Sequence, residues 1–291
     1  MRKLLLQLDS SKLPSVFDRV VAYDAGADEV MSYGAITPGD VRDLVYGCIF
    51  TRGPKDLKNT AVFIGGADMA AGEELLAAAQ KAVFKPFTVS LMLDSNGSNT
   101  TAVAAVAKMV QGAGGDVRGK RVLIVAGTGP VGVRAAGLFA RAGAGVVITS
   151  RKTDAGERAR DLVLKRFGGT VRAIAMPDAG EAVRACKGAA LLLNAGPAGV
   201  MLVPKQAWAN LPELEVVADV NAVPPLGVEG VETMDDGVTK EGVVCFGALA
   251  IGNLKMKLHK ACIVRLFERN DLVLDAETIA DVARELMAPK P

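Results

Sequence analysis

The stretch that decides the fold runs from Arg121 to Lys152 and reads RVLIVAGTGPVGVRAAGLFARAGAGVVITSRK. Its first apolar run, Val122 to Ala126, is too short for a helix and is typical of a strand buried on both faces. A helical pattern from Val131 to Arg141 follows, and then a second apolar run from Val146 to Thr149. The stretch therefore predicts a strand–helix–strand unit of a parallel sheet.

Three glycines at GxGxxG spacing lie between the first strand and the helix. Gly127 suits a tight turn, Gly129 allows close approach to a pyrophosphate, and Gly132 allows the helix to pack against the strand. The helix N-terminus adds free N–H groups and the positive end of a dipole. We therefore predict a dinucleotide site, with a unit that only packs as the alternative. The predicted phosphate-binding residues are Gly127, Thr128, Gly129, Pro130, Val131 and Gly132.

The residues after the second strand indicate which dinucleotide binds. NAD-specific sites usually carry an acidic residue there, which accepts a hydrogen bond from the ribose 2′-hydroxyl. This chain has Ser150, Arg151 and Lys152 instead. A guanidinium pairs bidentately with a 2′-phosphate, whereas a carboxylate would repel it. We therefore expect NADP as the cofactor, with NAD bound more weakly; two solvated surface cations are the alternative interpretation.

Two further turns are expected at the same edge of the sheet. One follows a predicted strand over residues 191–194, and the other follows a predicted strand over residues 215–220. Asp219 and Asn221 could contact the nicotinamide ribose or amide, or could only turn the chain. The predicted cofactor-binding residues in these turns are Ala195, Gly196, Asp219 and Asn221.

Composition excludes several classes of function. The chain of 291 residues is long enough for two domains with separate cores. Half of its residues are apolar, but no uninterrupted apolar run reaches about 18 residues, so we expect no membrane span. The net charge is +2 and no basic run alternates with aromatic residues, which gives no support for nucleic-acid binding.

The cysteines and the histidine do not suggest a metal site. Cys48, Cys186, Cys245 and Cys262 lie far apart in apolar patterns, as expected of buried thiols in a reducing cytoplasm. His259 is the single histidine, and no second ligand lies at zinc-binding spacing. We therefore expect no bound metal and a cytoplasmic location.

Before the dinucleotide unit, apolar runs alternate with helical patterns, which predicts another parallel α/β layer. The predicted strands are 3–8, 29–33, 60–64 and 87–93. A run of small polar residues, Asp94 to Thr101, follows the fourth strand, at the edge where open α/β sheets bind ligands. A helix is expected from Thr101 to Val110, so the alternative is that the polar run only caps it.

The fold class is therefore α/β, with two parallel-sheet domains and a ligand cleft between them. Ala113, Gly114 and Gly115 loosen the chain just before the dinucleotide unit, which makes them a plausible hinge. We predict a substrate domain over residues 1–112, completed by a C-terminal helix within about 270–291. The second domain, of Rossmann type, is predicted over residues 113–269.

Several strings of the chain resemble one known family. They are YDAGAD from Tyr23, FIGGADMAAGE from Phe63, LDSNGSNTT from Leu93, AGTGPVG from Ala126, ADVNAVPPLG from Ala218 and FGALAIGNLKMKLH from Phe246. Over nearly its whole length the chain resembles the NAD(P)-dependent methylene-tetrahydromethanopterin dehydrogenases of bacterial one-carbon metabolism. The resemblance implies a pterin-binding α/β domain beside a nicotinamide domain, and residues 150–152 place the chain with the NADP-linked branch.

The resemblance implies hydride removal from the one-carbon bridge of methylene-tetrahydromethanopterin in formaldehyde oxidation. The products would be the methenyl cation and NADPH. Because no proton has to move, such an enzyme needs positioning and exclusion of water rather than an acid–base pair. The implied catalytic residues are Asp94, which would balance developing positive charge, and Lys255. The candidate substrate-binding residues are Asp24, Asn96, Thr100 and Lys257; Lys255 and Lys257 point apart on a helix and are alternatively two solvated lysines.

Two other functions fit part of these features. A methylene-tetrahydrofolate dehydrogenase would share nearly all of them, because both pterins present the same reacting carbon. A non-catalytic NADP-binding sensor would need only the second domain, and would leave the polar run at Asp94 unexplained. The expected partners are the pterin substrate and further copies of the chain. Pterin preference, the degree of NADP selectivity, the number of copies and the direction of reaction stay open.

Overall fold

A computed structural model describes residues 1–288, and the chain divides into two compact units. Unit 1 comprises residues 1–100 and 256–291, and unit 2 comprises residues 101–255. These boundaries fall earlier than the predicted 112 and 269, because the chain changes unit inside the helices α4 (Ser98–Gly112) and α8 (Ala248–Leu266). The predicted C-terminal segment, about 270–291, extends past residue 288 and so lies partly outside the described residues.

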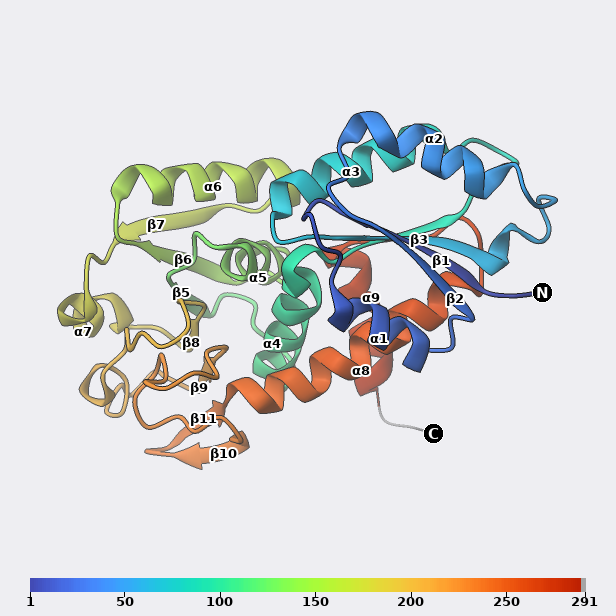
Figure 1. Ribbon diagram of the computed structural model, residues 1–291. Coiled ribbons are helices and arrows are strands. Elements are labelled where there is room, and N and C mark those ends of the chain that lie inside the picture. Colours follow the sequence, from blue (N-terminus) through green and yellow to red (C-terminus); the bar gives the residue numbers. More distant parts are fainter. Residues whose placement is uncertain (289–291) are drawn as a thin grey trace. The chain divides into compact units, whose positions relative to one another are not determined.

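Unit 1 is built on a parallel five-stranded sheet with the order β12-β4-β3-β1-β2 (Figure 1). The strands are β1 (Leu4–Asp9), β2 (Glu29–Tyr33), β3 (Thr60–Gly65), β4 (Ser90–Leu93) and β12 (Val273–Leu274). The other elements are α1 (Val16–Asp24), α2 (Pro38–Ile49), η1 (Leu57–Asn59), α3 (Met69–Ala82), η2 (Ser95–Gly97) and α9 (Ala276–Met287). Helices α2 and α3 cover one face of the sheet, whereas α1, α8 and α9 lie on the other.

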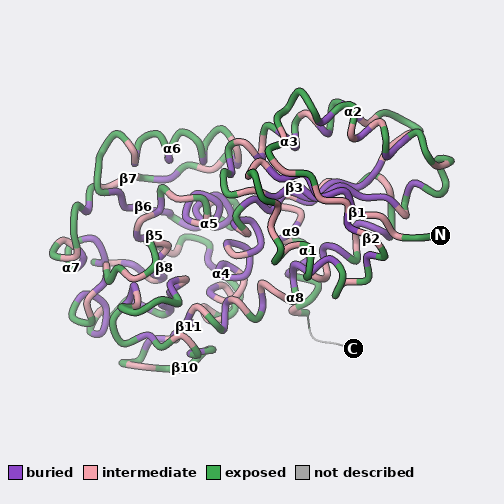
Figure 2. Tube along the Cα trace, viewed as in Figure 1, coloured by how far each residue is buried: buried purple, intermediate pink, exposed green. Residues whose placement is uncertain are grey.

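The strands of unit 1 are buried on both faces, which explains their continuous apolar runs. Leu8 and Ile64 pack with Val45 of α2 and Leu75 of α3. Phe63, the neighbour of Ile64 in β3, is also buried and points to the opposite face, because side chains alternate along a strand. Figure 2 shows the buried strands between more exposed helices. The predicted parallel layer is confirmed.

Unit 2 is built on a seven-stranded sheet with the order β10-β11-β9-β8-β5-β6-β7. The strands are β5 (Arg121–Val125), β6 (Gly145–Ser150), β7 (Val171–Ala175), β8 (Leu191–Asn194), β9 (Val216–Asp219), β10 (Asp236–Lys240) and β11 (Val243–Phe246). The helices that lie wholly in unit 2 are α5 (Pro130–Arg141), α6 (Thr153–Phe167) and α7 (Ala182–Cys186), with η3 (Ala179–Glu181) and η4 (Lys205–Ala207). Apart from the antiparallel edge strand β10, this is the doubly wound order of a Rossmann fold, which confirms the predicted class.

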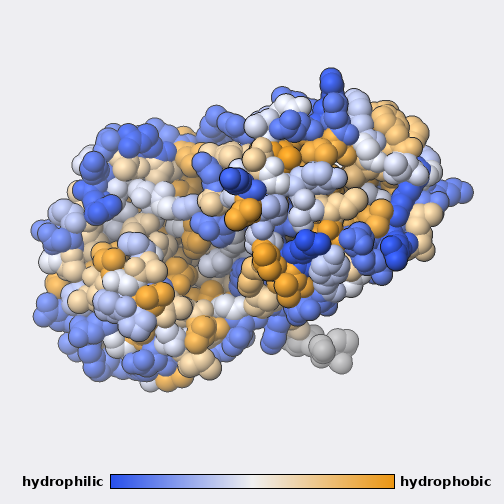
Figure 3. Space-filling view, in the orientation of Figure 1, coloured by the Kyte–Doolittle hydropathy of each residue, from blue (hydrophilic) through white to orange (hydrophobic). Residues whose placement is uncertain are grey.

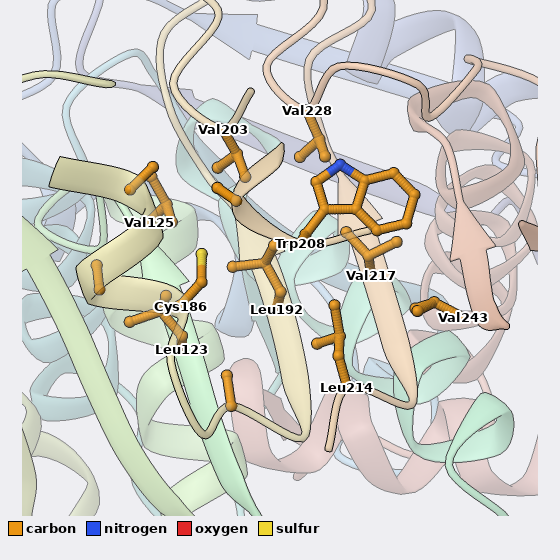
Figure 4. Close-up of a cluster of buried hydrophobic side chains, with 14 of the residues drawn as sticks. Leu123, Val125, Cys186, Leu192, Val203, Trp208, Leu214, Val217, Val228 and Val243 are labelled. Carbon is orange, nitrogen blue, oxygen red and sulfur yellow. The ribbon is translucent and has the colours of Figure 1, made fainter. Parts of the chain in front are cut away.

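One core of unit 2 is centred on the single tryptophan. The Trp208 side chain is fully buried, and its Nε1 donates a hydrogen bond to the Glu229 carbonyl oxygen at 2.9 Å. It packs with Leu192 of β8 and Val217 of β9, among other buried side chains (Figure 4). The indole N–H thus has a hydrogen-bond acceptor while the rings fill the core, and buried tryptophan side chains usually have such an acceptor.

The four cysteines are buried and unpaired. Burial raises the pKa of Cys48 and Cys245 to about 11 and that of Cys186 to about 12. The pKa of the Cys262 thiol is raised further, first by burial and then by the nearby negative charge of Asp94. The reactive thiolate is therefore scarce near neutral pH.

We expect these thiols to react very slowly with a disulfide reagent at about pH 8 in the native protein. Because each pKa is raised, the rate should increase as the pH rises towards it. All four thiols should react at once in guanidinium chloride. Absorbance of the released thiol measures this, and rapid reaction of a native cysteine would contradict the described burial.

Candidate functional site

The turn between β5 and α5 has the geometry expected of a dinucleotide-binding loop. A Cβ atom on Gly132 would lie 2.6 Å from the Cα of Gly127, so the helix approaches the turn as only glycine allows. A Cβ on Gly127 would lie 2.7 Å from the Cβ of Ile148 in β6. At Gly129, by contrast, an added Cβ would meet no atom within 4 Å. The backbone at Gly129 is therefore open to a ligand, and the residues present fit a dinucleotide.

Helix α5 begins at this open position. Gly129 is its N-cap and has no side chain to bond the first turn, while Pro130 has no N–H. The backbone N–H groups of Val131 and Gly132 therefore precede any intrahelical acceptor and are available to a ligand. Thr128 is exposed beside them. Together with the helix dipole, these donors favour an anion such as a pyrophosphate.

The end of β6 carries two exposed cations. The Ser150 side chain is buried, and its Oγ accepts a hydrogen bond from the Lys152 N–H at 3.3 Å. Arg151 and Lys152 are exposed, and within residues 1–288 no side chain pairs with either charge. Strand β6 lies directly beside β5, so both cations are placed next to the strand that leads into the glycine turn.

The turns after β8 and β9 are joined by a buried polar network. The Asn194 amide donates to Asp219 Oδ1 at 2.8 Å, and the Asn221 N–H donates to the same oxygen at 2.9 Å. The Val228 N–H donates to Asp219 Oδ2 at 3.0 Å. Both carboxylate oxygens of Asp219 are thus used to fix the turns, which supports the interpretation that Asp219 and Asn221 turn the chain.

Ala195 and Gly196 lie at the carboxyl end of β8, beside the glycine turn. The Ala195 N–H donates to the Val125 carbonyl oxygen at 3.0 Å, and the Gly196 N–H donates to Asn194 Oδ1 at 3.2 Å. Both residues are half-buried. The structure therefore brings them to the same edge as Gly129, as the sequence predicted.

Gly227→Ala is expected to destabilise this network. A Cβ at residue 227 would lie 1.8 Å from Asn194 Nδ2 and 2.9 Å from Asp219 Oδ1, so the amide would have to leave the carboxylate. Overpacking together with a lost buried hydrogen bond should lower the free energy of unfolding by about 2–4 kcal/mol. Urea denaturation measures this free energy of unfolding. Gly47→Ala, where a Cβ meets no atom within 4 Å, is the control, and equal stability of the two variants would contradict the network's role.

In unit 1, Asp94 directly follows β4 and is fully buried. The Thr100 N–H donates to its Oδ1 at 3.0 Å, and the Thr100 hydroxyl donates to its Oδ2 at 2.6 Å. Thr100 lies in the first turn of α4, so Asp94 caps that helix. The capping interpretation has direct geometric support, and Thr100 holds the carboxylate of Asp94.

The rest of the polar run forms a packed turn and not an open loop. The Ser95 hydroxyl donates to the Gly65 carbonyl oxygen at 2.8 Å, and the Asn99 amide donates to the Leu93 carbonyl oxygen at 2.6 Å. These polar groups form hydrogen bonds to nearby backbone carbonyl oxygens, so their burial costs little free energy. Asn96, with a positive φ of 55°, is exposed and keeps its side chain available.

His259 of α8 lies beside this turn. The sequence did not predict this position of the histidine. Its ring is fully buried and stacks on Phe63, with ring centroids 5.6 Å apart and planes 15° apart. Its Nδ1 lies 3.9 Å from Asp94 Oδ2. The two residues are far apart in the sequence and no local motif links them, so only the folded structure shows that an imidazole and a carboxylate meet here.

Asp24 does not lie beside Asp94. Asp24 is exposed at the end of α1, and its Oδ2 lies 2.8 Å from Nζ of Lys260. Helix α1 runs back from the carboxyl end of β1 to the amino end of β2, so Asp24 lies towards the sheet edge opposite Asp94. In α8, Lys255 is half-buried and Lys257 is exposed, as expected of side chains that point apart.

Within residues 1–288, no helix is both long and apolar enough to cross a membrane. The same residues contain no group of three or more histidine, cysteine, aspartate or glutamate side chains that could hold a metal ion.

The chain is similar to proteins of one family along its whole length. A family described as methylene-tetrahydromethanopterin dehydrogenase, N-terminal, matches residues 16–96. The chain is 51% identical to the bifunctional protein MdtA of Methylorubrum extorquens over 285 residues, 98% of this chain and 99% of that protein. It is 33% identical to the NAD(P)-dependent methylenetetrahydromethanopterin dehydrogenase of the same organism, over 98% of this chain and 99% of that protein.

Solved structures share the fold at low sequence identity. Shikimate 5-dehydrogenase from Listeria monocytogenes, in complex with shikimate and NAD, has a TM-score of 0.53 and 15% identity, over 99% of this chain and 96% of that one. Quinate dehydrogenase from Corynebacterium glutamicum, in complex with NAD, has a TM-score of 0.52 and 15% identity, over 97% of this chain and 98% of that one. These similarities support the two-unit α/β dehydrogenase fold.

Proposed function

The chain belongs to the methylene-tetrahydromethanopterin dehydrogenase family, and from that premise we propose that it oxidises methylene-tetrahydromethanopterin with NADP. The products are methenyl-tetrahydromethanopterin and NADPH, formed in one-carbon (formaldehyde) oxidation. The similarity to the named dehydrogenase over 98% of the chain is the observation that carries this proposal. The four unpaired cysteines suit a reducing compartment such as the cytoplasm.

The glycine turn and the end of β6 support the choice of cofactor. NADP supplies the hydride acceptor when it is bound. Its pyrophosphate would lie at Gly129 and at the N–H groups of Val131 and Gly132. The space beside Gly129 is open, because a Cβ added there would have no atom within 4 Å. Arg151 and Lys152, exposed and unpaired within residues 1–288, would hold the 2′-phosphate. An acidic residue at the same position would instead favour NAD.

The protein's own task in this reaction is positioning. The one-carbon bridge loses a hydride and becomes an amidinium cation, so no group has to accept a proton. Asp94 would offset the developing positive charge, and Thr100 holds its carboxylate through two hydrogen bonds. Asn96, exposed in the same turn, would bind a polar edge of the pterin, and Lys255 is the second charged candidate. Orientation of two reactants can remove roughly 7–11 kcal/mol from the barrier.

The test is a spectrophotometric assay of the purified full-length chain with both pterins and both nicotinamide cofactors. We expect NADPH to form from methylene-tetrahydromethanopterin and NADP, with a lower rate for NAD. Turnover of methylene-tetrahydrofolate alone would replace the proposal with the tetrahydrofolate activity. Tight NADP binding without turnover of either pterin would indicate a sensor instead.

A further inference from the structure

A fully buried histidine lies in unit 1 beside the polar turn that follows β4. His259 is the single histidine of the chain, and its side chain has no exposed surface. Burial of a polar ring costs free energy that a phenylalanine or leucine side chain in the same place would not cost. Polar residues that depart in this way from an apolar core are concentrated at functional sites. The imidazole is therefore a candidate for a role beyond packing.

Two aromatic rings restrict the orientation of this imidazole. Phe63 of β3 stacks on it, with ring centroids 5.6 Å apart and planes 15° apart. Phe17 of α1 lies 6.3 Å away between centroids, with its plane tilted by 45°. Both distances lie in the range of favourable aromatic contacts. The imidazole is therefore in contact with one ring of the core and with one ring that reaches the surface.

Helix α1 places an apolar surface next to this cluster. Val16, Phe17 and Val20 are 73%, 48% and 52% exposed, and Figure 3 shows hydrophobic residues gathered at the place that α1 occupies in Figure 1. Because α1 follows the carboxyl end of β1, its first turn lies at the same edge of the parallel sheet as Asp94. Apolar side chains here exclude water from the buried ring, so its interaction with a charge is weakly screened.

The Nδ1 atom of His259 is directed towards the carboxylate of Asp94. It lies 3.9 Å from Oδ2, the oxygen that also accepts the Thr100 hydroxyl at 2.6 Å. An N–H···O hydrogen bond is usually about 2.9 Å long, so the two atoms would have to approach by roughly 1 Å. Hydrogen bonds between catalytic groups often shorten in this way only when the substrate binds.

A second residue of α8 shows that this helix packs towards the same carboxylate. Burial raises the pKa of the Cys262 thiol, and the nearby negative charge of Asp94 raises it further. Cys262 follows His259 by three positions, so both side chains lie on one face of the helix. Both are fully buried. Asp94 therefore has Thr100 of α4 on one side and a buried face of α8 on another.

We propose that His259 is a positioning residue for the carboxylate of Asp94. Its neutral imidazole carries a proton on Nδ1, and this N–H donates to Oδ2 of Asp94 when the substrate binds. Together with Thr100, it holds the negative charge in one orientation before the reaction begins, as electrostatic stabilisation requires. The inference rests on the proposed function, in which Asp94 offsets the positive charge that develops as the hydride leaves.

The charge state of the imidazole is part of this proposal. A ring protonated on both nitrogens would form an ion pair with Asp94 and would offset the negative charge that the substrate cation needs. A neutral ring with its proton on Nδ1 orients the carboxylate and leaves that charge in place. The imidazole takes no proton from the substrate, in agreement with a reaction in which only a hydride leaves.

Nitrogen NMR of the full chain near neutral pH tests the contact independently of activity. Because His259 is the single histidine, labelling histidine with nitrogen-15 gives one pair of ring signals. We expect a neutral ring with its proton on Nδ1. In Asp94→Asn, Oδ1 can keep the Thr100 N–H, which puts the amide NH₂ in place of Oδ2. This group cannot accept a hydrogen bond, so the imidazole proton should move to Nε2.

Three NMR results would overturn the proposal. The first is a proton on Nε2 in the unchanged chain, because Nδ1 could then not donate to Asp94. The second is a ring protonated on both nitrogens. The third is an Asp94→Asn variant whose imidazole keeps its proton on Nδ1, because the tautomer would then not depend on the carboxylate.

His259→Phe tests the effect on the reaction, because phenylalanine keeps a ring against Phe63 and removes the nitrogens. We expect turnover to fall about ten- to hundredfold, with the Michaelis constant for NADP nearly unchanged. In His259→Asn the amide nitrogen can take the place of Nδ1, so this variant should retain more turnover than His259→Phe. Circular dichroism confirms folding of both variants. Normal turnover of the folded His259→Phe variant would mean that the ring only packs.

A double-mutant cycle tests whether His259 acts through Asp94. In the Asp94→Asn background, His259→Phe should lower turnover no further, because the group that it positions is absent. An equal loss in both backgrounds would contradict the proposal. Val264→Ala, a truncation at a 44% exposed position of α8, is the control and should keep normal turnover. If the unchanged chain turned over neither pterin, the proposed function would fail, while the tautomer would still decide whether His259 orients Asp94.

Discussion

Arg151→Ala is expected to raise the Michaelis constant for NADP about ten- to hundredfold and to change that for NAD little. The guanidinium is exposed at the end of β6 and has no side-chain partner within residues 1–288, so it is available for a 2′-phosphate. A hydrogen bond to a charged group contributes about 1.5–3 kcal/mol, which corresponds to this range. Initial rates with each cofactor at saturating pterin measure the effect.

Arg158→Ala is the matched control for this variant. Arg158 is also an exposed arginine of unit 2, but its guanidinium already pairs with Asp154 at 2.8 Å. Its loss should leave both Michaelis constants unchanged, because an exposed pair of this kind contributes little. An equal rise of the Michaelis constants for NADP and NAD in the Arg151 variant would show that the residue does not bind the 2′-phosphate.

The dinucleotide unit could be predicted from sequence because its constraints are local. The strand, turn and helix follow one another within residues 121–141, and the glycine spacing reflects contacts inside that segment. The contact of Gly132 with Gly127 joins residues only five positions apart, and the partner strand β6 is the next strand in the chain. Periodicity and turn chemistry suffice for such a unit.

The short strands at the sheet edges could not be predicted in the same way. Strand β12 contains two residues, and Val273 pairs with Leu91 from a distant part of the chain. Two residues cannot show an alternation of apolar and polar side chains. Strand β10 is exposed at every residue but its last and pairs with β11, so it lacks the apolar pattern of a buried strand.

The polar run after β4 shows why residue type did not settle its role. Small polar residues at the carboxyl edge of a sheet suit a ligand site and a helix start equally well. The structure uses most of them within the protein: Ser95 bonds to Gly65 and Asn99 bonds to Leu93. These acceptors lie in neighbouring strands, so their positions depend on how β3 and β4 pair. The same holds for His259, which reaches Asp94 only through the packing of α8.

Asp94→Asn is expected to lower turnover about a hundred- to a thousandfold while leaving NADP affinity nearly unchanged. The substitution keeps the shape of the side chain, and asparagine Oδ1 can still accept the Thr100 N–H that now lies 3.0 Å from the carboxylate. It removes the negative charge that would balance the cation formed as the hydride leaves. Stopped-flow turnover and NADP titration on the same folded variant separate the two effects.

Asp68→Asn is the control for capping alone. Asp68 is the N-cap of α3, and its Oδ1 accepts the N–H groups of Ala70 at 2.8 Å and Ala71 at 3.2 Å. Asparagine caps a helix about as well as aspartate, so this variant should keep both its stability and its turnover. If the Asp94 variant behaved in the same way, its carboxylate would serve only to begin α4. A large loss of turnover at Asp94, with a melting temperature close to that of the Asp68 variant, requires that the charge itself acts on the reaction.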